Sequence, residues 1–172
     1  KFFKFLDKNI FNILKIKSPF IQKAIYESCK IKKNVVERDE RESNIRKTLN
    51  FGHTFAHAYE ATLGYSKKLN HGEAVLLGIK SALQFSYVNK FLKEKDFHFL
   101  ITHIKKSKLP FNLNDYFSKK HINKILFFIS KDKKNNSEKI NLILLKKIGL
   151  PIIDKVYHRS ILKIFLKKEL TN

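Results

Sequence analysis

The sequence predicts a mainly α-helical domain, and three observations favour this class. Apolar residues recur every three to four positions through most of the 172-residue chain. One run, 140–145, has the dense aliphatic composition of a strand. No G-x-G-x-x-G or Walker sequence occurs, so these residues carry no dinucleotide-binding fold of their own. We expect one helical domain over residues 1–172, with one short strand or hairpin near 140–153.

Two helices are predicted before residue 37. The first follows the apolar period between Phe2 and Leu14. Ser18-Pro19 then predicts a cap, with proline in the first turn of the second helix. That helix runs toward Val36 and carries an apolar stripe with Lys32 beside it. A charged connecting loop follows at 37–44.

The remaining apolar periods predict five more helices and one strand. We expect helices at 46–60, from 71 to about 91, and at 97–104, 122–129 and 160–170. The strand is the run at 140–145.

The formal net charge of +21 raises the possibility of nucleic-acid binding. Basic residues are spread from Lys1 to Lys168, however, and form no stripe. The chain is also rich in Lys, Asn, Ile and Phe, a composition that A/T-rich codons produce without selection for a polyanion. We therefore interpret the charge as a solvated basic surface, which can still attract an anionic substrate.

One segment combines a polar stripe with otherwise apolar faces. Arg46, Asn50, His53, His57 and Glu60 are spaced by four, three, four and three residues. In a continuous helix these side chains would share one face. Because the other faces are apolar, the stripe is expected to line a cavity and not to face bulk water.

Histidines in and after this segment suggest a divalent metal site. His71 begins a new helical pattern beyond a short polar loop. His53 and His57, or one of them together with His71, could supply neutral imidazole ligands. The zincin motif H-E-x-x-H is absent, because Thr54 stands at its Glu position. Spacing alone leaves the ligand pair open.

These motifs closely resemble those of 3-dehydroquinate synthase, a sugar phosphate cyclase and the second enzyme of the shikimate pathway. The resemblance is carried by R-x-x-L-N-F-G-H-T-x-x-H-A-x-E at 46–60, by H-G-E-A-V at 71–75, and by K-x-x-V-V-x-x-D-E-x-E, which begins at Lys32 in this chain. A later D-K-K block begins at Asp132. Asn44 and Ala56 stand where the family usually has Gly.

The resemblance implies the C-terminal metal and substrate domain of a two-domain enzyme, α/β followed by α. Such an enzyme converts 3-deoxy-arabino-heptulosonate 7-phosphate to 3-dehydroquinate and phosphate, on the route to chorismate and the aromatic amino acids. NAD and a divalent metal, zinc or cobalt, are the implied cofactors. No residue of this chain is assigned to NAD.

Residue roles follow from the same resemblance. His53 and His71 are the expected metal ligands, and a third ligand, a Glu, would lie just before Lys1. Lys32, Arg46, Asn50 and His57 are the expected catalytic residues, with Arg46 clamping an anionic group of the substrate. Glu60 and Glu73 are read as structural or as supporting the site. The resemblance alone implies that Lys133 or Lys134 binds an anionic group.

The chain is interpreted as a fragment. It contains no Met, so residue 1 is not an ordinary translation start. The partner it lacks is then the N-terminal NAD-binding half of the same protein. Without that half we expect no catalysis and an exposed apolar docking surface. A homodimer is the expected assembly of the whole enzyme.

Two alternatives to this function fit parts of the sequence. Another sugar phosphate cyclase is the closer rival, and a basic helical nucleic-acid-binding module is the more distant one. A single cysteine, Cys29, fits a reducing cytosol, and no apolar run approaches the length of a membrane span. We therefore expect a cytoplasmic protein that binds neither membrane nor nucleic acid.

Overall fold

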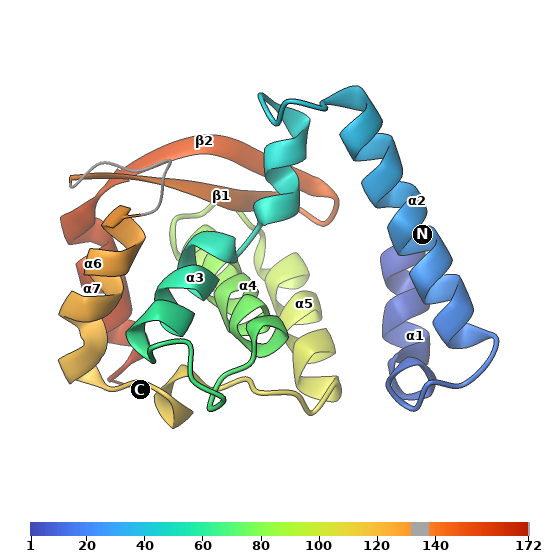
Figure 1. The fold of residues 1–172 in the computed structure, drawn as a ribbon, viewed down its shortest axis with the longest axis horizontal. Coiled ribbons are helices and arrows are strands. Elements are labelled where there is room, and N and C mark those ends of the chain that lie inside the picture. The colour runs from blue at the N-terminus through green and yellow to red at the C-terminus, as the bar shows by residue number, and fades with distance from the viewer. Residues whose placement is uncertain (132–137, 172) are drawn as a thin grey trace.

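The computed structural model describes residues 1–131 and 138–171. Within them the prediction of a mainly α-helical fold is confirmed, since helices make up all but two of the elements (Figure 1). The elements, in chain order, are α1 (Phe2–Leu14), α2 (Phe20–Arg38), η1 (Ile45–Asn50), α3 (His53–Thr62), α4 (His71–Val88), α5 (Glu94–Lys106), η2 (Leu113–Asp115), η3 (Lys119–His121), α6 (Ile122–Lys131), β1 (Lys139–Lys147), β2 (Leu150–His158) and α7 (Arg159–Glu169).

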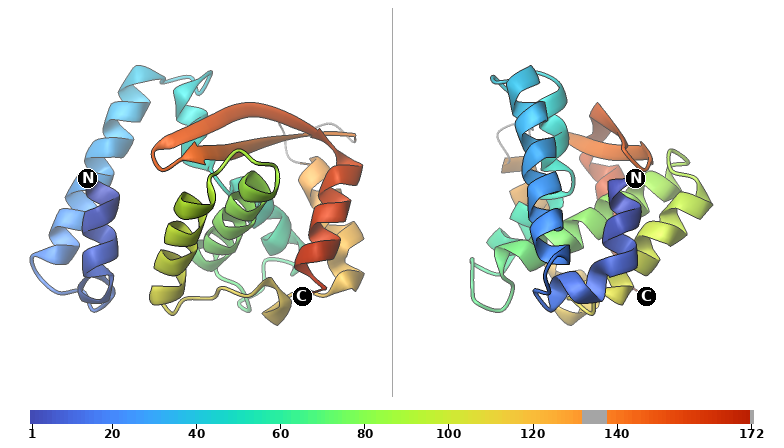
Figure 2. Two further views of the ribbon diagram at one scale, coloured as in Figure 1. Left: turned by 180° about the vertical axis from the view of Figure 1, so that it is seen from behind. Right: turned by 90° about the vertical axis from the view of Figure 1, so that its right-hand side faces the viewer.

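Helices α3 and α4 form the centre of the molecule. They pack side by side, with α6 against the other side of α3 and α7 beside α6 (Figures 1 and 2). Phe55 and Tyr59 of α3 are at most 1 % exposed, as is Leu77 of α4. Their burial excludes water from most of both helices, as the apolar faces of the sequence predict.

The strands form one antiparallel hairpin that covers α4. Ile140, Leu142 and Leu144 alternate inward along β1 and are at most 2 % exposed. Gly149, with φ of 81°, occupies the turn. The hairpin extends to residue 158, beyond the limit of 153 that the sequence suggested. Strand β2 is partly exposed and has no strict alternation of buried and exposed residues. Because it also contains Pro151 and charged residues, its sequence lacks the pattern of a strand.

Helices α1 and α2 pack on each other at one side of the molecule (Figure 1). Phe3 of α1 contacts Phe99 and His103 of α5 edge-on. Asp7 accepts hydrogen bonds from His103 at 3.0 Å and from Lys106 at 3.1 Å. These contacts attach the helical pair to α5.

Much of the apolar surface of this helical pair is exposed. In α2 only Ala24 is buried, although the sequence shows an apolar stripe there. The large apolar side chains of α1, α2 and the link between them that remain exposed are Phe11, Leu14, Ile16, Ile25, Tyr26 and Ile31.

The predicted cap of α2 is wrong in detail. The helix begins at Phe20, and Pro19 stands at the N-cap position without a side-chain cap. The Ser18 hydroxyl accepts a hydrogen bond from the Gln22 side chain at 3.1 Å and does not cap the backbone.

The continuous helix predicted over 46–60 is also wrong. Residues 45–50 form the 3₁₀ helix η1, and α3 starts only at His53. Gly52 separates them with φ of 84°, a left-handed conformation that an α-helix cannot contain. Arg46 and Asn50 therefore do not continue the face of α3 that carries His53 and His57.

Candidate functional site

Three imidazoles from two helices form a cluster, here called the histidine cluster: His53, His57 and His71. His53 and His57 lie one turn apart on α3, and His71 is the first residue of α4. The ring centroids are 5.6 Å apart for His53 and His57, 6.1 Å for His53 and His71, and 6.4 Å for His57 and His71. The structure thus brings together all three pairs of ligands that the sequence left open.

His53 is the least solvated member of the cluster. Its Nδ1 is buried and, within the described part of the chain, makes no hydrogen bond. Burial lowers the pKa of His53, and a positive charge on His57 or His71 would lower it further, while the carbonyls of Phe51 and Asn50 act in the opposite direction. His53 is therefore favoured as a neutral imidazole, the form that binds metal.

His71 is held by an acidic residue of the neighbouring helix. Its Nδ1 lies 3.1 and 3.2 Å from the two carboxylate oxygens of Glu60. Glu73 has a different role, because its carboxylate accepts the backbone N–H of Asn70 at 2.9 Å and completes a capping box at the start of α4. Glu60 thus contacts the histidine cluster, whereas Glu73 stabilises the start of α4.

A cleft opens beside His53. Its volume is about 410 Å³, and it is lined by Phe2, Ser28, Ile31, Lys32, Leu49 and His53. Lys32 of α2 and His53 of α3, two predicted site residues, therefore face the same space. Lys32 and its neighbour Ile31 are exposed, so an anion bound beside this ammonium group would stay partly solvated and its attraction to Lys32 partly screened.

Arg46 is positioned by the loop after α2. The Asp39 carboxylate accepts the backbone N–H groups of Arg46, Asn44 and Ser43 at 2.8–2.9 Å. These hydrogen bonds, led by the one from Arg46, lower the pKa of Asp39 from 3.8 to about 2, although burial opposes them. The guanidinium of Arg46 donates to the carbonyl of Glu40. In the sequence, Asp39 stands only as part of the motif that begins at Lys32, and it was assigned no role.

Asn50 also contacts this loop. Its side-chain amide donates to the Glu42 carboxylate at 2.6 Å. Among the described residues, no side-chain hydrogen bond joins Arg46 or Asn50 to the histidine cluster. The loop thus organises one part of the predicted site, and the start of α3 and α4 organises the other. Lys133 and Lys134 lie outside the described residues.

The donor types of the histidine cluster fit a divalent metal, but the cluster is not a complete metal site. Neutral imidazole is a common ligand, and the buried Nδ1 of His53 has no other partner in the described chain. Yet within residues 1–131 and 138–171 no three His, Cys, Asp or Glu side chains are arranged to hold an ion. A further ligand or a rearrangement is needed to complete it, and the third ligand expected from the sequence stays a prediction.

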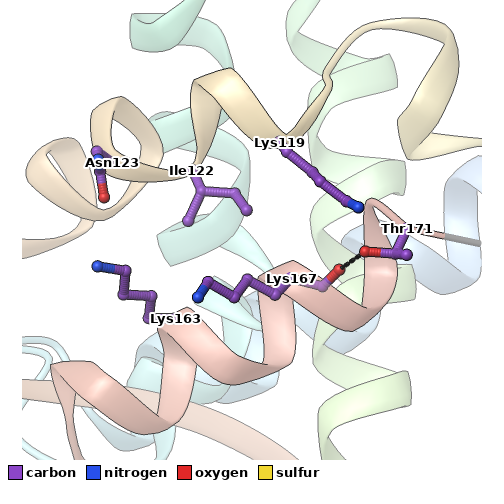
Figure 3. Close-up of a pocket in the computed structure, with 6 residues that line it drawn as sticks. All are labelled: Lys119, Ile122, Asn123, Lys163, Lys167 and Thr171. Carbon is purple, nitrogen blue, oxygen red and sulfur yellow. Dashed lines mark hydrogen bonds between the residues drawn. The ribbon is translucent and has the colours of Figure 1, made fainter.

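A second hollow, of about 480 Å³, lies between α6 and α7 (Figure 3). Lys119, Lys163 and Lys167 line it, and the Thr171 hydroxyl donates to the carbonyl of Lys167. All three lysines are exposed, as is common on a surface with 36 basic residues. This hollow shares no lining residue with the cleft beside His53, and it has the properties of an ordinary basic surface.

A hollow lined by lysine does not by itself indicate nucleic-acid binding. In the described ranges, no helix has the length and apolar character needed to cross a membrane.

The fold and the histidine cluster define a helical domain that brings three imidazoles together beside a cleft. Comparison with known proteins supplies the family. The family model "3-dehydroquinate synthase C-terminal" matches residues 1–135. The chain belongs to this family.

Whole-length relatives agree with this assignment. The chain is 57 % identical over 171 residues to the 3-dehydroquinate synthase of Pelagibacter ubique, covering 99 % of this chain and 46 % of that protein. It is 36 % identical over 162 residues to the enzyme of Thermoanaerobacter pseudethanolicus, covering 94 % and 44 %. It is 39 % identical over 172 residues to that of Dictyoglomus turgidum, covering 95 % and 45 %. The chain thus spans about half the length of the curated relatives it matches.

Solved structures show the same fold. A 2-deoxy-scyllo-inosose synthase complexed with carbaglucose-6-phosphate, NAD⁺ and Co²⁺ matches with a TM-score of 0.66 and 21 % identity, over 87 % of this chain and 40 % of that one. A second structure of 2-deoxy-scyllo-inosose synthase matches with a TM-score of 0.55 and 19 % identity, over 76 % and 34 %. At this identity the likeness concerns the fold.

Proposed function

We propose that the whole protein containing these residues is a 3-dehydroquinate synthase. It would convert 3-deoxy-arabino-heptulosonate 7-phosphate to 3-dehydroquinate and phosphate. The observation that carries this proposal is the histidine cluster beside a cleft lined by Lys32, in a chain 57 % identical to a synthase over nearly its whole length. The conversion has no net redox change, because the hydride removed from a ring carbon is later returned.

NAD and a divalent metal are the proposed cofactors. When bound, NAD supplies a temporary hydride acceptor, and the metal polarises substrate oxygens and lowers the pKa of the hydroxyls. His53 and His71 are the proposed metal ligands in this chain, with a carboxylate from outside these 172 residues as the third. The binding site for NAD is also assigned to the part outside these residues.

Arg46 is proposed to bind an anionic group of the substrate. Its planar guanidinium can donate two parallel hydrogen bonds to a carboxylate or phosphate. Its present acceptor is a backbone carbonyl, a neutral partner that an anion can replace with a gain in electrostatic energy. The backbone of Arg46 is meanwhile fixed by Asp39, which limits the entropy lost when the substrate binds.

Lys32, Asn50 and His57 complete the proposed contacts. Lys32 lines the cleft and can neutralise a second anionic group of the substrate. The Asn50 amide, now paired with Glu42, can bind a hydroxyl. His57 lies beside both proposed metal ligands and is placed to exchange protons with the substrate.

A phosphate-release assay tests this proposal. A protein of the relatives' length that contains these residues, supplied with NAD, metal and the heptulosonate phosphate, should release phosphate and form 3-dehydroquinate in equal amounts. Residues 1–172 alone should release none. Failure of the long protein to form 3-dehydroquinate, or turnover by the 172 residues at the rate of a complete synthase, would contradict the proposal.

The two rival functions give different results in simple assays. Another sugar phosphate cyclase would turn over a different sugar phosphate in preference to the heptulosonate phosphate. A nucleic-acid-binding module would shift DNA or RNA in a gel at physiological salt and lose this binding as salt rises. The proposed assembly is a homodimer, which a measurement of the molar mass of the same protein in solution would test. The proposed location is the cytoplasm.

A further inference from the structure

Glu60 connects the two helices that carry the histidine cluster. It lies on α3, one turn after His57, and its carboxylate contacts the first residue of α4. The Glu60 side chain is 12 % exposed, whereas that of His71 is 63 % exposed. The carboxylate is therefore the fixed member of the pair, and the imidazole is the one that needs orientation.

We propose that Glu60 is the positioning residue for His71, and that it directs Nε2 of His71 toward the bound metal. This inference rests on the proposed function, because it concerns one of the two proposed metal ligands. Glu60 itself does not contact metal or substrate in this assignment. It acts through the imidazole.

The argument follows from the atoms in contact. An ionised carboxylate is an acceptor only, so the nitrogen facing it carries the proton. Both Glu60 oxygens lie within 3.2 Å of Nδ1. The hydrogen on Nδ1 leaves the lone pair on Nε2, which makes no hydrogen bond in the described chain. Nε2 is then the nitrogen available to a metal.

Carboxylate acceptance also changes the imidazole as a ligand. A hydrogen bond from the distal N–H to a carboxylate fixes the ring orientation and raises the basicity of the ligating nitrogen. Because Glu60 belongs to the same rigid helix as His53 and His57, it ties His71 to the other two imidazoles. Without it, an exposed His71 at a helix start would sample other rotamers.

The first test reads the tautomer of His71 without any metal. Histidine ¹⁵N chemical shifts would be recorded on the full-length protein in its metal-free form, with His71→Asn to assign the signal. The wild-type protein should carry the proton on Nδ1 of His71. In Glu60→Ala that preference should be lost, and Glu60→Gln, which keeps a neutral acceptor, should retain part of it.

The second test measures Co²⁺ affinity in the same proteins. Glu60→Ala should weaken binding by about 10- to 100-fold, and Glu60→Gln by less. Glu73→Gln is the matched control, since its carboxylate contacts the Asn70 backbone and a glutamine retains that hydrogen bond. The control should bind Co²⁺ as the wild type does.

The outcomes separate this inference from the proposed function. Wild-type tautomer and Co²⁺ affinity in both Glu60 variants would overturn the inference, even if thermal stability falls. If Glu60→Ala does not fold, Glu60→Gln decides by the same criterion. If the wild type carries the proton on Nδ1 but binds no Co²⁺ and has no turnover, the proposed function fails while the orienting contact stands.

Discussion

Gly78 of α4 packs directly against the carbonyl oxygen of Gly52, the residue that precedes α3. A Cβ at Gly78 would overlap this oxygen and would lie 2.8 Å from the amide nitrogen of Ala56. A Cβ at Gly52 would lie 2.5 Å from the backbone nitrogen of Ile79. The two helices that carry the histidine cluster therefore approach each other through backbone atoms, and side chains cannot absorb a change there.

Gly78→Ala should therefore destabilise the protein by about 1–3 kcal/mol, because the backbone of α3 must move to admit the methyl group. Urea unfolding of the full-length protein measures this loss. Gly72→Ala is the matched control on the same helix, since its Cβ would meet no atom within 4 Å, and it should cause no loss. Equal stability of the two variants would contradict the close packing.

Arg46→Ala should reduce kcat/KM by about 100-fold or more, because it removes two hydrogen bonds to a charged group, each of which contributes about 1.5–3 kcal/mol. Its unfolding midpoint should change little, because Asp39 accepts the backbone N–H of Arg46, which alanine retains. Arg41→Ala, an exposed arginine of the same loop, should have normal kinetics. Near-normal turnover of Arg46→Ala would remove the residue from the site.

Asp39 should make stability depend on acid pH. Its pKa is about 2 in the folded protein and 3.8 in the unfolded chain, so the unfolded state binds the proton more readily. The contribution of Asp39 is thus fully present above pH 3.8 and is lost as the pH falls through 3.8 toward 2. Asp39→Asn should be less stable than wild type at neutral pH, and the difference should shrink below pH 4.

Urea titrations of both proteins between pH 2 and pH 7, a range that spans the ordinary carboxylate values, would measure this difference. Glu37→Gln provides the control, since that exposed carboxylate has one partner, Lys33, at 3.6 Å. Exposed pairs contribute little to stability, so the control should follow the wild type at every pH. A difference for Asp39→Asn that is the same at pH 2 and pH 7 would show that the carboxylate charge has no role.

Anomalous scattering from a cobalt- or zinc-loaded crystal of the full-length protein should locate the metal against His53 and His71. His57 should then remain free to contact substrate. Metal between His53 and His57, with His71 remote, would show that the predicted ligand pair is wrong. His53 and His57 are the main alternative pair of ligands, because their ring centroids are 5.6 Å apart, compared with 6.1 Å for His53 and His71.

The sequence predicted most of the helices because each contains apolar residues spaced three or four positions apart over several turns, a pattern that strands do not have. The helices α1, α4, α5, α6 and α7 begin within about three residues of their expected positions. The family was also indicated by the sequence, because His53, His57 and His71 stand in motifs that resemble those of 3-dehydroquinate synthase; their spacing alone left the metal ligands open. The second strand, β2, was only suggested as part of a hairpin, because a partly exposed strand that contains Pro151 lacks a clear period.

The sequence by itself determined the residue types of the proposed site and placed His53 and His57 on one helix and His71 at the start of the next. Only the tertiary structure decided how these residues meet. The spacing of three and four residues predicts Arg46 on one helix face with His53. Gly52 has a left-handed conformation that ends this face, and Gly78 packs against its carbonyl oxygen. The contacts of Asp39 with Arg46 and of Glu60 with His71 depend on directions that the chain acquires only when loops and helices pack, so no local pattern encodes them.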